Sequence, residues 1–145
     1  MIKHDVSLIG APTDVGAGTP GARMGPDALR VAGMAAAIEK FGIAVRDCGN
    51  VTGPANPGLP ALDGFRHLPE VVQWNRLVHD AVYAELHANR LPILLGGDHS
   101  LSIGSISAVA RHCRERHQKL RVLWFDAHAD FNTATLTPSG NIHGM

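Results

Sequence analysis

Four short runs of mainly apolar residues along the chain predict buried strands. Three of the runs are followed directly by glycine or aspartate, which mark the turns where strands end. Continuous apolar runs of this length are typical of parallel strands that are covered on both faces, whereas a half-exposed strand would alternate apolar and polar residues. The predicted strands are Val6–Ile9, Gly42–Val45, Leu91–Leu95 and Arg121–Phe125.

Longer segments with helical spacing of apolar residues lie between these runs. Pro26 is well placed in a first helical turn. The predicted helices are Pro26–Phe41, Glu70–Asn89 and Ser102–Arg114. Strands that alternate with helices in this way form βαβ units. We therefore predict an α/β fold, a three-layer α/β/α sandwich with a mostly parallel sheet. The segment Asn50–Pro69, rich in glycine and proline, is predicted to be a long loop whose role the sequence does not indicate.

Composition narrows the possible functions of this single predicted domain. The 145 residues include 13 basic and 13 acidic ones, so no excess of charge favours nucleic acid or a membrane surface. No apolar run approaches the roughly 20 residues that span a bilayer. The distant Cys48 and Cys113 are expected to be free, buried thiols of a cytoplasmic protein. Five of the nine histidines are expected at the surface: His67, His79, His87, His112 and His117.

The segment Asp126–Asp130, of sequence DAHAD, follows the last predicted strand directly. In an extended backbone, alternate residues project to one side, so Asp126, His128 and Asp130 should converge. The carboxyl end of a parallel strand is also where open α/β sheets place their ligands. A divalent cation would relieve the repulsion between the two carboxylates. The alternative is a solvated loop whose acidic side chains cap neighbouring helices.

A second polar segment, Gly96–Ser100 of sequence GGDHS, also follows a predicted strand. The two glycines allow a sharp turn that presents His99 beside the end of the Asp126 strand. Taken alone, His99 could equally be a packed histidine near a helix start that is capped by Ser100 or Ser102. Together with Asp126, His128 and Asp130, it favours a metal site. Mixed carboxylate and imidazole ligands indicate a first-row metal such as manganese rather than thiolate-bound zinc.

A third polar segment comprises Asn132 and the loop Thr137–Gly144. Its hydroxyl and amide groups are suited to a small polar substrate, and His143 could carry a proton near neutral pH. The alternative is an ordinary turn that is rich in serine, asparagine and glycine.

These three segments, in this order, resemble the arginase branch of the ureohydrolase family, which also includes agmatinases and formiminoglutamases. The segments Ile9–Gly33 and Val45–Asn50 are similar to the family as well, so the resemblance covers nearly the whole chain. It implies the arginase/deacetylase-like three-layer fold. It also implies manganese-dependent hydrolysis of L-arginine to L-ornithine and urea, by attack of a metal-bridging hydroxide on the guanidinium carbon.

The resemblance also implies roles for individual residues. Two Mn²⁺ ions per complete subunit would be held, with Asp126 bridging both, and His143 would be the catalytic proton carrier. The implied metal ligands are His99, Asp126, His128 and Asp130, and the implied substrate-binding residues are Asn132, Thr137, Ser139 and Asn141. For the complete protein, the resemblance implies a homo-oligomer, either a trimer or a hexamer.

One departure from the family pattern qualifies these expectations. The family's second pair of metal-binding aspartates, and the glutamate that pairs with the guanidinium group, would lie beyond Met145. Residues 1–145 are therefore expected to be the N-terminal portion of a single ureohydrolase domain and to be inactive alone. Two alternatives stay open. The complete protein could act on another guanidino compound, as an agmatinase or guanidinobutyrase does, or the chain could be a non-catalytic metal-binding fragment.

Overall fold

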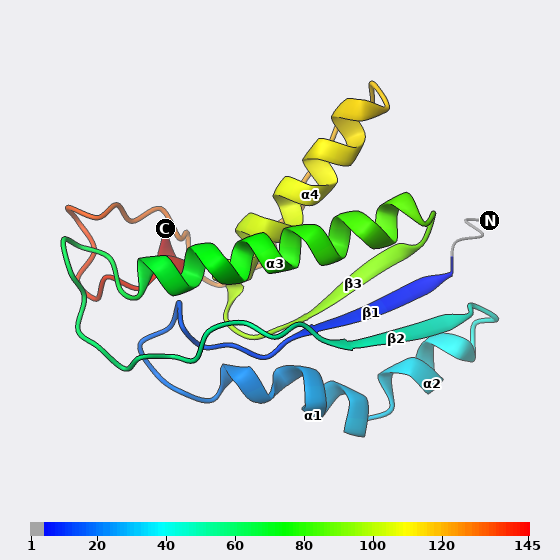
Figure 1. Ribbon diagram of the computed structural model, residues 1–145, viewed down its shortest axis with the longest axis horizontal. Helices are drawn as coiled ribbons and strands as arrows, with labels where there is room; N and C mark the ends of the chain where they lie inside the picture. Colours follow the sequence, from blue (N-terminus) through cyan, green and yellow to red (C-terminus); the bar gives the residue numbers. More distant parts are fainter. Residues whose placement is uncertain (1–4) are drawn as a thin grey trace.

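A parallel sheet of three strands forms the centre of the computed structural model, which describes residues 5–145. The strands are β1 (Val6–Ala11), β2 (Val45–Asn50) and β3 (Leu91–Gly96). Their order is β2-β1-β3, and both pairings are parallel (Figure 1). The strand that comes first in the sequence is thus central, and every residue of β1 is buried.

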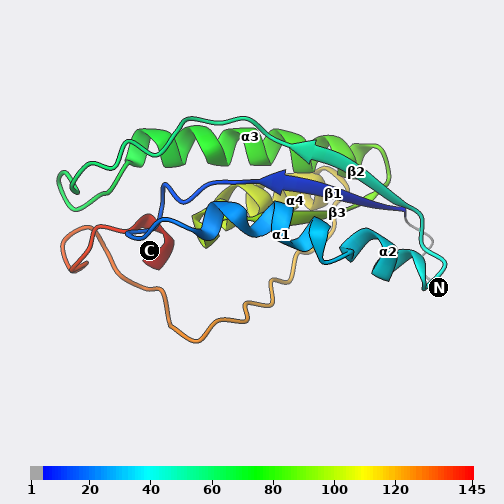
Figure 2. The same cartoon turned by 90° about the horizontal axis from the view of Figure 1, so that it is seen from below.

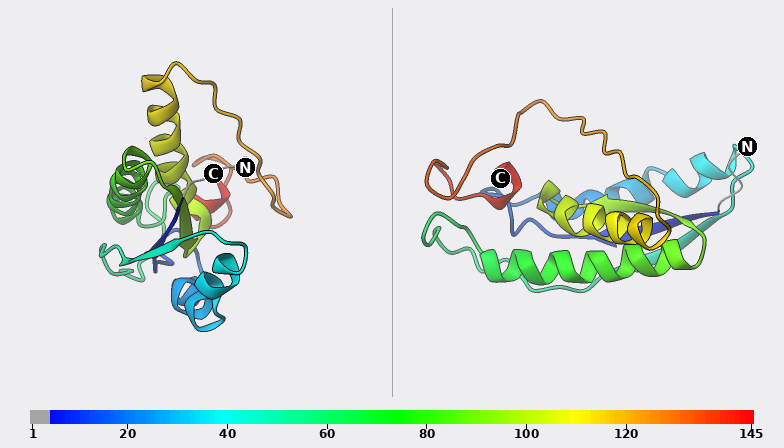
Figure 3. Two further views of the ribbon diagram at one scale, coloured as in Figure 1. Left: turned by 90° about the vertical axis from the view of Figure 1, so that its right-hand side faces the viewer. Right: turned by 90° about the horizontal axis from the view of Figure 1, so that it is seen from above.

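Helices cover both faces of this sheet, as Figure 3 shows. One face carries α1 (Gly25–Val31) and α2 (Met34–Glu39), and the other carries α3 (Leu68–His87) and α4 (Ser102–Glu115). Single 3-10 turns occur at Ala22–Met24, His99–Leu101 and Ile142–Gly144. This arrangement confirms the predicted α/β class with three layers. None of the helices formed by residues 5–145 is long and apolar enough to cross a membrane.

The two faces of the sheet have separate hydrophobic cores because side chains along β1 alternate in direction. Val6 and Leu8 pack with Leu95 and the apolar side of α2. Ile9 and Ala11 point the other way and join the larger core beneath α3 and α4. That second core includes Val71, Trp74, Val78, Val82, Leu101 and Ala108.

The helix predicted over Pro26–Phe41 is two helices in the structure. Gly33 has φ 80° and ψ 32°, a left-handed conformation, and it is the N-cap of α2. Because glycine adopts this conformation without steric cost, the chain can turn here and follow the sheet. The strand predicted at Gly42–Val45 instead begins at Val45. It is an edge strand whose residues are mostly exposed, so the strand does not coincide with the apolar run that was used to predict it.

The strand predicted over Arg121–Phe125 is wrong as well. Residues 118–126 have no regular structure. In Figure 2 this part of the chain is an orange trace that stands away from the sheet. Leu123 is 72% exposed and Phe125 is 92% exposed. A strand needs a hydrogen-bonded neighbour and covered faces. Residues 5–145 provide neither for this run, despite its strand-like composition.

Two expectations about individual side chains also need correction. His67, expected at the surface, is buried, because its ring nitrogens lie 2.9 Å from the carbonyl oxygens of Val15 and Leu59. The other four histidines of that group are exposed or half-buried, as expected. Cys48 and Cys113 are free thiols, but Cys48 is exposed and Cys113 only half-buried, so neither is a core residue.

Candidate metal centre and substrate cleft

The turn after β3 holds His99 in place through its neighbour Asp98. One carboxylate oxygen of Asp98 accepts a hydrogen bond from the backbone N–H of Gly16 at 3.0 Å, and the other accepts from that of Ser100 at 3.1 Å. Asp98 is therefore the cap of this turn, in place of the serines considered as caps from the sequence. A Cβ at Gly97 would lie 2.5 Å from the carbonyl oxygen of Thr13, so this close approach requires glycine.

The Asp126–Asp130 turn comes close to His99 from the unpaired segment. Asp126 Oδ2 lies 3.9 Å from His99 Nε2. Asp130 has φ 46°, so the chain bends at this residue instead of continuing as a strand. His99, Asp126 and Asp130 each offer one ligand atom within 4.8 Å of the others. The structure thus brings together three of the four predicted metal ligands.

His128, the fourth predicted ligand, lies beside this group but outside it. Its Nδ1 is 3.6 Å from Asp126 Oδ1, and its side chain is 85% exposed. The backbone N–H of His128 donates to the same carboxylate at 2.9 Å. This hydrogen bond, aided by the nearby His99 ring, lowers the pKa of the Asp126 carboxyl, which favours the charged form that binds cations.

The donor set fits a bound divalent cation. His99 Nδ1 and Asp130 Oδ2 are buried atoms that have no hydrogen-bond partner within the described residues. Buried polar atoms are rarely left unpaired, because each costs about 1–3 kcal/mol of desolvation energy. A cation held between imidazole nitrogen and carboxylate oxygen would satisfy both atoms, and such mixed ligands suit a first-row metal.

A cleft of about 400 Å³ opens beside this centre. Its lining includes three of the predicted metal ligands and four of the predicted catalytic and substrate-binding residues: His99, His128, Asp130, Asn132, Ser139, Asn141 and His143. The ring of His143 stacks on that of His99, with centroids 4.9 Å apart. Thr137 is placed differently from the other predicted substrate residues. Its hydroxyl accepts a hydrogen bond from the backbone N–H of Gly140 at 3.0 Å, and its side chain does not line the cleft.

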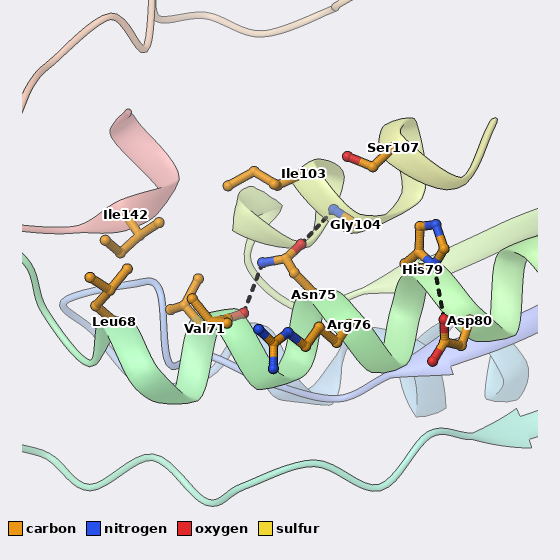
Figure 4. A pocket seen from close by; sticks show the side chains of 11 residues that line it. Leu68, Val71, Asn75, Arg76, His79, Asp80, Ile103, Gly104, Ser107 and Ile142 are labelled. Carbon is orange, nitrogen blue, oxygen red and sulfur yellow. Dashed lines mark hydrogen bonds and ion pairs between the residues drawn. The ribbon is translucent and has the colours of Figure 1, made fainter. Parts of the chain in front are cut away.

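A larger hollow, of about 620 Å³, lies elsewhere, between α3 and α4 (Figure 4). Its walls are mainly apolar, and Asn75 closes its floor by accepting from the backbone N–H of Gly104 and donating to the carbonyl of Val71. It contains none of the predicted site residues, so we place the candidate site in the smaller cleft.

Three residues at the site were missed in the sequence. Asp98 fixes the turn that carries His99, and its position before a short helix was the available signal for a cap. Trp124 meets the ring of His99 edge-on, with centroids 5.7 Å apart. Arg66 hydrogen-bonds to Asn141 across 75 positions of sequence, a contact for which no local pattern exists.

The chain is similar to known proteins over nearly its whole length. The model of the Arginase family matches residues 4–145. The arginase of Brevibacillus brevis is 40% identical over 144 residues, which make up 99% of this chain and 47% of that protein. The native structure of arginase from Bacillus caldovelox has a TM-score of 0.87 at 38% identity, with 98% of this chain and 47% of that chain covered. Entamoeba histolytica arginase, solved in complex with L-ornithine, has a TM-score of 0.87 at 35% identity, with 100% and 49% covered. The chain spans about half the length of the relatives that it matches.

Proposed function

This chain belongs to the arginase family, and we propose that the complete protein hydrolyses L-arginine to L-ornithine and urea. The observation that carries the proposal is the convergence of His99, Asp126 and Asp130, whose ligand atoms lie within 4.8 Å of one another. His99 and Asp130 also line a cleft that contains amide, hydroxyl and imidazole groups. We further propose that residues 1–145 form the N-terminal portion of one ureohydrolase domain.

The proposed cofactor is manganese, two ions per complete subunit. His99, Asp126, His128 and Asp130 would hold it. When bound, such ions lower the pKa of water and so supply a strong nucleophile at neutral pH. The ring of His128 is exposed, but its Nδ1 lies 3.6 Å from Asp126 Oδ1, which is close enough for both residues to contribute to one site.

The protein's own residues would bind and orient the substrate. Asn132, Ser139 and Asn141 would hydrogen-bond the α-carboxylate, with Thr137 acting through the backbone of the same loop. This would place the guanidinium carbon near the metal centre. When its C–N bond breaks, the departing amine of ornithine needs a proton. The His143 imidazole would deliver it, and its stacking on His99 within the lining of the cleft supports this role.

The test is urea release by the full-length protein. We expect release from L-arginine with Mn²⁺, loss of activity after a chelator removes the metal, and recovery when Mn²⁺ is added back. Agmatine, which lacks the α-carboxylate, should be turned over several orders of magnitude more slowly, because a site built to hydrogen-bond a group rejects an analogue without it. Faster turnover of agmatine than of arginine would identify an agmatinase instead. Activity with neither compound would favour a non-catalytic metal-binding role.

A further inference from the structure

The long loop between β2 and α3 is anchored at several points by specific contacts. We call residues 52–67 the strap. The indole N–H of Trp74 donates to the carbonyl of Pro54 at 2.9 Å, and a Cβ at Gly53 would collide with the same ring. Further along, Asn56 donates to Asp14, and the buried His67 contacts Val15 and Leu59. The strap is thus fixed to α3 and to the loop after β1.

The last part of the strap is hydrogen-bonded to the loop Thr137–Gly144, which carries the proposed substrate contacts and which we call the substrate loop. Arg66 Nε donates to Asn141 Oδ1 at 3.0 Å, and Arg66 Nη2 donates to the carbonyl oxygen of Ser139 at 3.3 Å. Its Nη1 donates to the carbonyl of Leu59 at 3.1 Å, within the strap itself. The backbone N–H of Arg66 donates to the carbonyl of Gly140 at 2.8 Å. One residue therefore links the strap to three consecutive residues of the substrate loop.

Close packing reinforces this link at Gly140. This glycine is buried and has φ 72°, a conformation that side chains rarely adopt. A Cβ at this position would lie 2.5 Å from that of Ala61 in the strap. The turn at Gly140 therefore fits against the strap with no space to spare, and its conformation depends on the strap being in place.

The bond from Arg66 also sets the orientation of the Asn141 amide. A side-chain amide has one acceptor oxygen and one donor NH₂ group, and the orientation follows from its partners. Because Arg66 can only donate, it takes the oxygen of Asn141. No acceptor among residues 5–145 takes the NH₂ group, so it is available to an acceptor in the cleft that Asn141 lines. A carboxylate is such an acceptor, whereas agmatine has a hydrogen atom in place of the carboxylate and offers no acceptor there.

We propose that Arg66 is a positioning residue that sets the preference for substrates bearing an α-carboxylate, by holding Ser139–Asn141 in shape and presenting the Asn141 amide as a donor. This inference rests on the proposed function and extends it to a residue outside the cleft. It requires a guanidinium group, since the planar fork of arginine reaches three acceptors in fixed directions and the single ammonium of lysine does not.

The test compares Arg66→Ala with wild type in the full-length protein. We expect the KM for L-arginine to rise about tenfold or more, as loss of a charge-assisted hydrogen bond predicts, while kcat changes less than about twofold. Agmatine turnover should stay at the wild-type level, since it does not use the carboxylate contacts. Arg66→Lys should recover only part of the loss. Arg76→Ala, which removes an exposed arginine on α3, is the matched control and should leave KM unchanged.

Two measurements distinguish positioning from a general structural effect. In an Asn141→Ala background, Arg66→Ala should raise the KM less than it does in wild type, because the part of its effect that acts through Asn141 is already lost; fully additive effects would contradict the proposal. Hydrogen exchange of the backbone amides of residues 137–144 should quicken several-fold in Arg66→Ala, with α3 unchanged. Unchanged exchange in that loop would overturn the positioning role by itself. A wild-type protein that releases no urea would overturn the proposed function instead.

Discussion

The two turns that meet at the candidate metal centre are held in very different ways. The His99 turn follows a paired strand. Its Asp98 carboxylate accepts one hydrogen bond from the backbone N–H of Gly16, in the loop after β1, and one from that of Ser100, within the turn. The Asp126–Asp130 turn follows an unpaired segment. Among residues 5–145, the side chain of Asp126 accepts hydrogen bonds only from the backbone of its own turn, at His128 and Ala127. The His99 turn is therefore anchored to the core of the fold, whereas the Asp126–Asp130 turn only lies next to it.

This difference shows which part of the centre the chain organises by itself. His99 sits in a turn whose backbone groups are already paired, so its ring is largely positioned before any ligand arrives. Asp126 and Asp130 lie on a bend whose apolar neighbours, among them Leu123 and Phe125, are left uncovered. Their final geometry must come from partners that residues 5–145 do not supply, such as cations. The first turn should then respond to changes in its hydrogen bonds, and the second to metal.

The largest effect is expected from Asp98→Ala, which would break the fixed turn. The change leaves the N–H groups of Gly16 and Ser100 buried without acceptors, each costing about 1–3 kcal/mol. We expect the free energy of unfolding of the full-length protein, measured by denaturant titration, to fall by roughly 3–5 kcal/mol. Asp80→Ala is the control, because that side chain is 81% exposed, and it should change stability little. Equal effects of both substitutions would show that the His99 turn is no better anchored than the surface.

An intermediate effect on the free energy of unfolding is expected from an ion pair near the start of β3, the strand that precedes His99. Glu85 on α3 accepts hydrogen bonds from Arg90, just before β3, and from Ser7 on β1. The Arg90 guanidinium and then the Ser7 hydroxyl lower the pKa of Glu85 from 4.5 to about 2. Because the folded pKa is depressed, the ion pair stabilises the fold fully above about pH 4.5 and the contribution is lost as pH falls through 2.

Glu85→Gln tests this contribution. We expect it to cost about 1–2 kcal/mol of unfolding free energy at pH 7, since glutamine keeps an acceptor but not the charge. The variant should also lose less stability than wild type between pH 4.5 and pH 2. The same titration on Glu39→Gln, an exposed position on α2, provides the reference curve. Identical acid dependence in wild type and Glu85→Gln would contradict the assignment.

The same contrast explains how far the sequence predicted the fold. The spacing of apolar residues correctly predicted strands β1 and β3 and helices α3 and α4. The segments that cover these elements lie within the chain, so their apolar residues are buried as the pattern indicates. Arg121–Phe125 has the composition of a buried strand, but pairing is a property of two segments, and one segment cannot reveal that its partner is missing. His67 was missed for a related reason, since its burial depends on contacts with Val15, 52 positions away.

The sequence predicted which residues gather at the candidate site better than it predicted how their side chains are arranged. Parallel strands end at the same edge of a sheet, so the motifs after two predicted strands were expected to meet. His99, Asp126 and Asp130 do meet, although the run before Asp126 forms no strand within residues 5–145. The expected strand-like alternation through Asp126–Asp130 was wrong, because the left-handed backbone at Asp130 bends the turn. His128 lies outside the group of three and is 85% exposed. Sequence spacing predicted which residues gather here but not the direction of each side chain.

The smallest effect is expected from His128→Ala, which isolates the loosely held turn. Its side chain is 85% exposed and has Asp126 as its only described partner, so in metal-free protein we expect the free energy of unfolding to change by less than about 0.5 kcal/mol. His99→Ala should cost about 1 kcal/mol under the same conditions, because that ring stacks on His143 and meets Trp124. Adding Mn²⁺ should then raise the melting temperature of wild type more than that of His128→Ala. A ligand that binds only the folded state stabilises it, and the stabilisation is larger when the ligand binds more tightly. An equal rise in both proteins would show that His128 is not a ligand. A large loss of metal-free stability in His128→Ala would show instead that this turn is as well anchored as the one that carries His99.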